Sequence, residues 1–252
     1  MPSTVVHVAL AGLVGTALLA EHFDGKAVAV VMAATALVDF DVFLGFWIAG
    51  AHRSAFHTLL LPLAAGGVLW WDFVRRDRSL VRARWGARGV RVAWVGVVAV
   101  AFAGIGLDAF FNGVNLFYPV HDRFYDLSGK VFYSTEKGFV QTLVSVDVEA
   151  VADALLPHEG GSSGPAGGSG GGASASGGAG GSGGGGGAGG DSAPAPTTEN
   201  THYSTGVDPQ KGAEDESVER LFPIAYTGER ALVALTGYSV VGLRVWMERR
   251  RE

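Results

Sequence analysis

Four residues of types that bind metal ions lie close together in this sequence. Asp39 and Asp41 lie within a run of apolar residues, and His52 and His57 follow soon after it. A carboxylate in an apolar segment is costly, and it normally persists only when it is paired, hydrated or bound to a metal ion. Carboxylates combined with imidazoles suit zinc or manganese. We therefore predict a divalent metal site, with zinc first and manganese as the alternative.

The spacing of these residues sets conditions on the backbone. On a straight helix, Asp39 and Asp41 would point about 200° from each other. Both reach one site only if the helix is distorted, which transmembrane helices tolerate around a polar cavity. The alternative is that neighbouring helices satisfy each carboxylate separately. His52 and His57 can share a site if His52 lies in a turn and His57 lies on the first turn of the next helix.

Three further residues are candidates for the same site. His7 and Asp108 are ionisable groups near the ends of other apolar runs, and we expect them to complete the set of metal ligands. Arg53 could neutralise a phosphate or carboxylate near the metal and is the candidate catalytic residue. Its alternative role is that of an interfacial arginine whose head group extends to the lipid head groups. No cysteine is present, so thiolate ligands and disulfides are excluded.

Long apolar runs must position these residues, and they predict an all-α, polytopic membrane protein. The first run lacks the Lys or Arg of a signal peptide, so we expect it to be retained as a helix. Five transmembrane helices are expected, at 4–20, 27–50, 54–74, 92–111 and 231–246.

The predicted organisation has five parts. A four-helix membrane region with the metal site covers 1–111, and a segment outside the cytoplasm covers 112–158. A Gly/Ser-rich insertion covers 159–199, and its composition predicts disorder. A second outer segment covers 200–228, and the last helix with its basic tail covers 229–252.

Basic residues predict the orientation in the membrane. The 75–91 loop contains seven arginines and one aspartate, and Arg249–Arg251 is a run of three arginines. Cytoplasmic loops collect Lys and Arg, so we place both inside, which puts the N-terminus outside and the C-terminus in the cytoplasm. The 112–229 segment, with 15 acidic and five basic residues, then lies outside. In this topology all the candidate site residues fall at one depth on the outer side.

Three motifs resemble those of the membrane-bound metal-dependent hydrolase family, the YdjM-like or LexA-regulated group. These motifs are a His in the first helix (His7), Val38-Asp39-Phe40-Asp41 in place of Pro-Asp-x-Asp, and His52-Arg53-Ser54-Ala55-Phe56-His57-Thr58 in place of His-Arg-Gly-x-x-His-Ser. A fourth, His-x-x-x-Asp, is matched at Asp108 but has Gly104 at the histidine position. The resemblance covers residues 1–120. Gly104 leaves three alternatives: fewer metal ions, a substitute ligand such as His121, or loss of activity.

The resemblance implies a hydrolase in the cell membrane. The arrangement of His and Asp is also similar, more distantly, to that of zinc-dependent phospholipases, which suggests a phosphoester or phospholipid substrate at the outer face of the lipid bilayer. The alternative is a non-catalytic membrane protein, either a metal or proton transporter or a scaffold. A transporter needs polar groups in both halves of the bilayer, whereas these are predicted in one. The sequence indicates no nucleic-acid partner and leaves the oligomeric state open.

Overall fold

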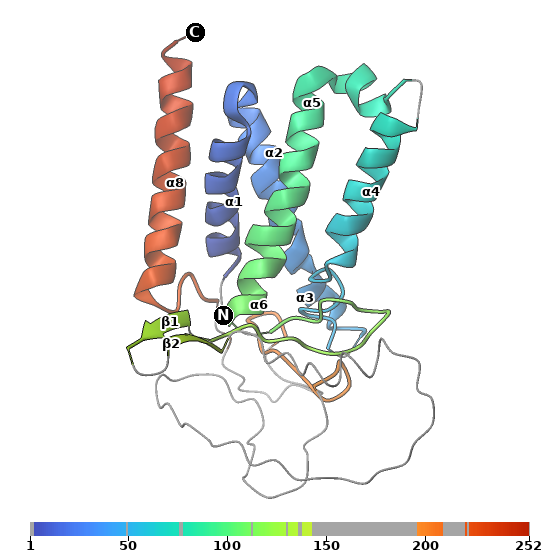
Figure 1. Cartoon of the computed structure of the whole chain (residues 1–252), viewed down its shortest axis with the longest axis vertical. Coiled ribbons are helices and arrows are strands. Elements are labelled where there is room, and N and C mark those ends of the chain that lie inside the picture. The colour runs from blue at the N-terminus through green and yellow to red at the C-terminus, as the bar shows by residue number, and fades with distance from the viewer. Residues whose placement is uncertain are drawn as a thin grey trace, which may run out of the picture. The chain divides into compact units, whose positions relative to one another are not determined.

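The computed structural model of the protein is mostly helical (Figure 1). It describes residues 3–48, 50–75, 78–111, 113–129, 131–135, 138–142, 196–208, 220 and 222–251. The chain divides into two compact units, one formed by Met1–Ser128 with Gly185–Glu252 and the other by Gly129–Gly184. The predicted disordered insertion at 159–199 lies almost wholly outside the described residues.

Each of the five predicted helical regions contains a helix. The helices are α1 (Thr4–Leu18), α2 (Gly25–Ala36), α3 (Asp41–Leu44), α4 (Leu60–Val74), α5 (Leu80–Ala99), α6 (Leu107–Phe111) and α8 (Gly228–Arg249). By length and composition, two helical runs in the described chain could cross a membrane: Gly25–Leu44 and Leu80–Phe111. Thr4–Leu18 and Leu60–Val74 are shorter apolar helices.

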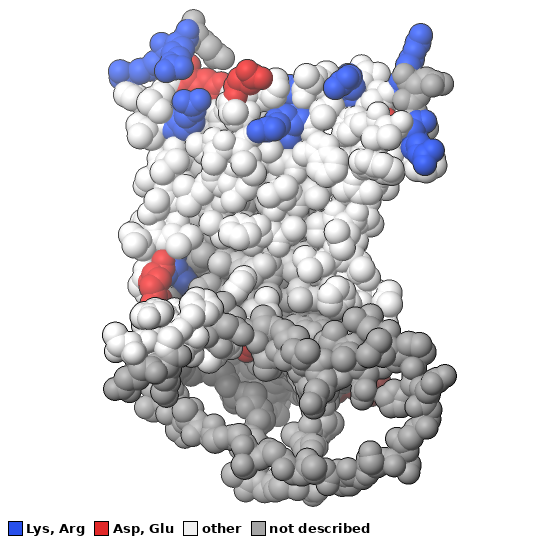
Figure 2. Space-filling model, viewed as in Figure 1, with Lys and Arg blue, Asp and Glu red and all other residues white. Residues whose placement is uncertain are grey.

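The surface of the helical unit has an uneven charge distribution. Lys and Arg gather at one end of the helices on the face shown in Figure 2, and most of the surface below them is uncharged. We call this end the Arg-rich end; its exposed arginines in the described chain include Arg75, Arg78, Arg82, Arg84, Arg88, Arg249, Arg250 and Arg251. Large apolar side chains such as Leu63, Val68 and Leu235 are more than half exposed on the helices. Such a surface suits a lipid environment, because water would disfavour so much exposed apolar area.

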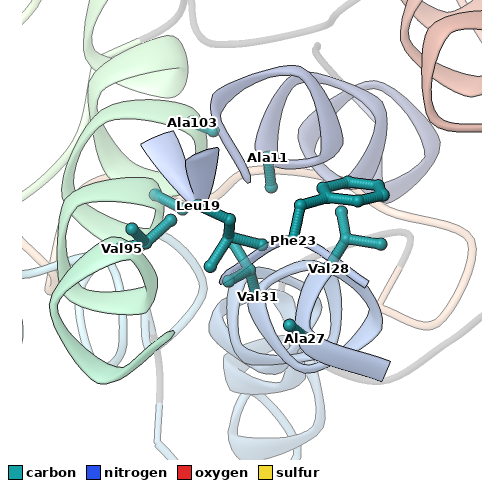
Figure 3. Close-up of a cluster of buried hydrophobic side chains, with 9 residues drawn as sticks. Ala11, Leu19, Phe23, Ala27, Val28, Val31, Val95 and Ala103 are labelled. Atoms are coloured by element: carbon teal, nitrogen blue, oxygen red, sulfur yellow. The ribbon is translucent and has the colours of Figure 1, made fainter. Parts of the chain in front are cut away.

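The largest core cluster joins α1, α2 and α5. Leu19, Val31 and Val95 are buried in it, and Phe23 closes one side (Figure 3). Alanines occupy much of the remaining contact surface, among them Ala11, Ala27, Ala99 and Ala103. Small residues let helix backbones approach closely, so packing can hold membrane helices together where the hydrophobic effect contributes little.

Polar contacts fix the helix connections at the Arg-rich end. Asp72, which is buried near the end of α4, accepts hydrogen bonds from the Ser79 hydroxyl (2.6 Å) and the Leu80 amide (2.9 Å). Asp24 caps α2 through the Ala27 amide (2.7 Å). These carboxylates satisfy amide groups at helix starts that have no partner within the helix.

Two helices lose regular α geometry at the opposite end, which we call the site end. After α2 the chain forms a 3-10 turn over Leu37–Phe40 and then α3. The helix that begins as α5 becomes a π-helix over Val100–Gly106 and then α6. Departures of this kind rotate side chains relative to a regular helix and often mark functional sites. Asp39, Asp41 and Asp108 all lie in or beside these two distortions.

Some predicted boundaries differ from the structure. The helix expected from Ser54 begins at Leu60, so His57 lies in the preceding turn and not on a first helical turn. The helix expected from Val92 begins at Leu80, with a kink at Gly86, whose φ of 66° is left-handed. The second unit contains an antiparallel hairpin of β1 (Val131–Ser134) and β2 (Gly138–Gln141), which the all-α prediction did not include.

Candidate metal centre

The turn after α3 is folded around the carboxylate of Asp41, which is fully buried. Its Oδ1 lies 2.9 Å from Nδ1 of His52, and its Oδ2 lies 2.7 Å from Nδ1 of His57. The backbone amide of Arg53 donates a 3.0 Å hydrogen bond to Oδ2. One carboxylate therefore sets the positions of both histidines of the sequence motif.

The other nitrogen of His57 faces two more carboxylates. Its Nε2 lies 3.0 Å from Oδ2 of Asp108 and 3.4 Å from Oδ1 of Asp39. These distances suit ion pairs, but Nε2 has no hydrogen-bond partner among the described residues. Because Nδ1 is directed at Asp41, an Nδ1–H tautomer would leave the Nε2 lone pair directed at this group.

His7 approaches the same carboxylates from α1. Its Nδ1 lies 2.6 Å from the carbonyl oxygen of Ala103, in the π-helical segment. Its Nε2 lies 3.6 Å from Oδ2 of Asp108. A carbonyl oxygen can only accept a hydrogen bond, so Nδ1 must carry the proton and Nε2 is left as the lone-pair nitrogen in the neutral ring.

Ligand atoms of His7, Asp39 and Asp108 lie within 4.8 Å of one another, so this group could hold a metal ion. Two oxygens of the group, Oδ2 of Asp39 and Oδ1 of Asp108, are buried without a hydrogen-bond partner in the part of the chain described. Buried polar atoms without partners cost free energy. A cation among them would offset this cost, and the set of oxygens and imidazole nitrogens suits a divalent ion.

Arg53 is held beside this group in a strained backbone conformation. Its φ of 65° is in the left-handed region, which costs a non-glycine residue about 1–3 kcal/mol. Its amide is bound to Asp41, and its carbonyl accepts a 2.9 Å hydrogen bond from the amide of Asn115. The guanidinium is buried, with Nη2 at 3.9 Å from Oδ1 of Asp108 and with the ring of Tyr203 over it.

Residues 113–128 and 196–208 contact the site end and one another. Asp122 accepts hydrogen bonds from the amide and the hydroxyl of Thr198 and from the side chain of Asn115. Partial burial raises the pKa of the Asp122 carboxyl, but these hydrogen bonds outweigh it and lower the pKa below its usual value. Burial raises the pKa of the Tyr203 phenol, although the nearby Arg53 opposes this shift.

The structure separates the predicted site residues into two neighbouring groups. Ligand atoms of His7, Asp39 and Asp108 form the first group, and Nε2 of His57 lies 3.0 Å from Asp108 and 3.4 Å from Asp39. Asp41 forms the second group with His52: it contacts Nδ1 of His57 through one oxygen and Nδ1 of His52 through the other. The predicted distortion of the helix carrying both aspartates is present as the 3-10 turn.

Other residues that shape the site end were not singled out from the sequence. They are Asn115, Asp122, Thr198 and Tyr203. An asparagine inside the apolar stretch Val114–Phe117 is the one signal that pointed to any of them. His121, considered as a substitute ligand, is exposed, pairs with Phe117 and is not part of the group.

Gly104 lies in the π-helical segment and faces the helix that carries Asp39. A Cβ at this position would lie 3.5 Å from side-chain atoms of Thr35 and Val38, which is ordinary contact. The position thus points at the helix packed beside it, one turn before Asp108.

The family model described as YdjM inner membrane protein matches residues 1–161. No curated protein and no solved structure matches the chain. The matched region includes every residue of the candidate metal centre, but it ends before Thr198 and Tyr203.

Proposed function

Because the chain belongs to the YdjM inner membrane protein family, we propose that it is a membrane-bound, metal-dependent hydrolase. Its substrate class would be a phosphoester or a lipid-related molecule at the outer face of the cell membrane. The observation that carries this proposal is the convergence of His7, Asp39 and Asp108 in a buried group in which Oδ2 of Asp39 and Oδ1 of Asp108 have no hydrogen-bond partner among the described residues. Structural carboxylates inside a membrane protein are normally paired, so an unsatisfied cluster is a functional-site hypothesis by default.

The residues of the centre fall into two sets, those that bind the metal ion and those that orient the metal ligands. We assign the metal to Asp39, Asp108 and Nε2 of His7 and His57. Asp41 fixes the tautomer and orientation of His57, and through its other oxygen it orients His52. A bound divalent ion such as zinc would lower the pKa of a water molecule and so supply hydroxide near neutral pH.

Arg53 gives the site a preference for anions. Its guanidinium lies beside Asp108 at the edge of the group, and guanidinium groups bind phosphate oxygens through paired N–H donors. The strained backbone at Arg53, held through its amide and its carbonyl, indicates that this position is fixed at a cost in stability. Binding of a phosphate group against Arg53 would place its phosphorus beside the carboxylates that hold the metal.

We further propose five membrane crossings, with the N-terminus outside and the C-terminus in the cytoplasm. The Arg-rich end then faces the cytoplasm, in agreement with the distribution of Lys and Arg in membrane proteins (Figure 2). The site end, and with it the metal centre, faces outward. A substrate would reach the site from the outer leaflet or from the space beyond it.

The test begins with metal binding by the purified full chain in detergent. We expect zinc binding by calorimetry, a fall of at least about tenfold in affinity for Asp39→Asn and His57→Gln, and no change for His22→Gln. His22 is a suitable control because it lies at the other end of α1, beside Glu21. Zinc-loaded protein should then hydrolyse bis(p-nitrophenyl) phosphate, and a chelator should abolish the reaction.

The outcomes separate the alternatives. Absence of zinc and manganese binding by the wild type would refute the metal centre. Metal binding without hydrolysis of phosphodiesters or phospholipids would favour the non-catalytic alternative, a metal transporter or scaffold. Equal metal affinity for wild type and Asp39→Asn would show that the ion binds elsewhere.

A further inference from the structure

Tyr203 belongs to the 196–208 segment, yet it lies against a residue of the motif that contains His52 and His57. The centre of its ring lies 4.3 Å from the guanidinium carbon of Arg53. The ring of Phe124 packs on it from another side, with centroids 5.3 Å apart. Tyr203 therefore links the segment after the Gly/Ser tract to the centre of the site.

The contact between Tyr203 and Arg53 can also orient the guanidinium, because that group is flat. The group is planar, with its N–H donors in the plane and its faces free for stacking. An aromatic ring over one face attracts the cation and restricts its rotation. This ring does not cover the edge of the group, where Nη2 lies 3.9 Å from Oδ1 of Asp108, an ion-pair distance longer than a hydrogen bond.

Hydrogen bonds and close backbone packing hold the segment that carries Tyr203 in place. Thr198 donates from its hydroxyl (2.6 Å) and its amide (3.0 Å) to Asp122. The amide of Phe124 donates to the carbonyl of Pro196 at 2.9 Å. Gly50, at the start of the turn that contains Arg53, packs so closely on the backbone of Thr198 that a side chain at position 50 would collide with it.

We propose that Tyr203 is a positioning residue for Arg53 and thereby determines the affinity of the site for an anionic oxygen group such as phosphate. The inference rests on the proposed function, since it concerns the anion that would approach the metal centre. It adds a residue from beyond the part of the chain that the family model covers.

The first experiment measures binding of inorganic phosphate to the zinc-loaded full chain by calorimetry. Tyr203→Ala should weaken binding about tenfold, whereas Tyr203→Phe, which keeps the ring, should stay within about twofold of the wild type. Zinc stoichiometry should be equal in all three. Tyr226→Ala removes an exposed tyrosine from the described outer chain and is the control for loss of a phenol.

Three results would overturn the proposal. They are unchanged phosphate affinity in Tyr203→Ala, an equal loss in Tyr203→Phe, and no phosphate binding by zinc-loaded wild type. A wild type that binds no zinc would instead count against the proposed function, and a second experiment then tests Tyr203 without metal.

The second experiment uses phenylglyoxal, which modifies accessible arginines, with detection by peptide mass spectrometry. Arg53 should be protected in the wild type and in Tyr203→Phe and should react at least about tenfold faster in Tyr203→Ala, because the face of its guanidinium is then uncovered. Arg82, which is exposed at the Arg-rich end, provides an internal standard. Equal protection of Arg53 in all variants would overturn the role given to Tyr203.

Discussion

His57 and Asp41 make the closest contact between two side chains in the metal centre, with Nδ1 of the histidine 2.7 Å from Oδ2 of the aspartate. The pair is fully buried. It joins the turn before α4 to the start of α3, and it sets which nitrogen of His57 faces Asp39 and Asp108. In the metal centre that we propose, Asp41 therefore orients a histidine and does not bind the metal itself.

The first prediction concerns this pair. Asp41→Asn keeps the size of the side chain but introduces an amide that can donate toward Nδ1. The other tautomer of His57, with its proton on Nε2, then becomes more favourable, and Nε2 no longer offers a lone pair. We expect zinc affinity to fall about 10–100-fold, with folding retained, measured by competition with a chelator.

A matched variant separates this effect from loss of charge alone. Asp24→Asn removes a carboxylate that caps the start of α2 at the Arg-rich end, the end opposite the metal centre. It should lower the thermal midpoint but leave zinc affinity unchanged. If Asp41→Asn binds zinc as tightly as the wild type, Asp41 does not orient His57 in the way proposed.

The sequence predicted the helical regions because they depend on local, strong signals, whereas the depth of the site in the membrane stays a prediction. Long apolar runs require helices in lipid, and ionisable residues such as His7 and Asp108 stand out within them. The resemblance to the YdjM-like group is confirmed by the family match. These features follow from residue types and spacing without knowledge of tertiary contacts.

Other features could not be predicted because they depend on contacts between distant parts of the chain. Nothing local shows that Asp39 faces His7 while Asp41 faces His52, since that division follows from the 3-10 turn between α2 and α3. The late start of α4 reflects a turn whose Leu59 amide donates to the carbonyl of Leu116. Tyr203 follows a long Gly/Ser-rich stretch, so no spacing rule connects it to Arg53.

The second prediction concerns the pH dependence of the 196–208 segment. The pKa of Asp122 is lowered in the folded protein, so its hydrogen bonds to Thr198 stabilise the segment above the usual aspartate pKa of about 3.9 and are lost as pH falls through the folded value. We expect faster amide hydrogen exchange in 196–208 below about pH 4, after correction for the intrinsic pH dependence of exchange.

Asp122→Asn should reproduce this effect at neutral pH, because the amide replaces one of the oxygens that accept from Thr198. Asp126→Asn is the control, since Asp126 bonds the Ser128 amide and not Thr198. Unchanged exchange in Asp122→Asn would mean that Asp122 does not hold the segment.

The third prediction tests the proposed orientation. A cysteine introduced at Ser169, within the Gly/Ser-rich tract, would be the only thiol in the protein, because the natural chain has no cysteine. It should react with an impermeant maleimide in intact cells. A cysteine at Arg251 should react only after lysis. The reverse pattern would place the metal centre on the cytoplasmic side.

The fourth prediction concerns the contact between α1 and α8, which holds the helix of His7 in place. Gly237 of α8 is buried against the backbone of α1, and a Cβ there would lie 2.5 Å from the carbonyl oxygen of Ala9 and 2.8 Å from its carbonyl carbon. Gly242 of the same helix has no atom within 4 Å of such a Cβ. The two glycines therefore form a matched pair with opposite expectations.

Gly237→Ala forces α8 away from α1, since backbone atoms cannot move aside as a flexible side chain could. We expect it to destabilise the protein by about 1–3 kcal/mol and to weaken zinc binding, because His7 lies one half-turn before Ala9 on α1. Gly242→Ala should leave zinc affinity unchanged and raise stability by up to about 1 kcal/mol through its better helix propensity. Thermal unfolding in detergent and calorimetry with zinc measure both effects. Equal behaviour of the two variants would show that α8 does not pack on α1 through Gly237, and a stabilised Gly237→Ala with normal zinc affinity would remove α8 from the set of elements that position His7.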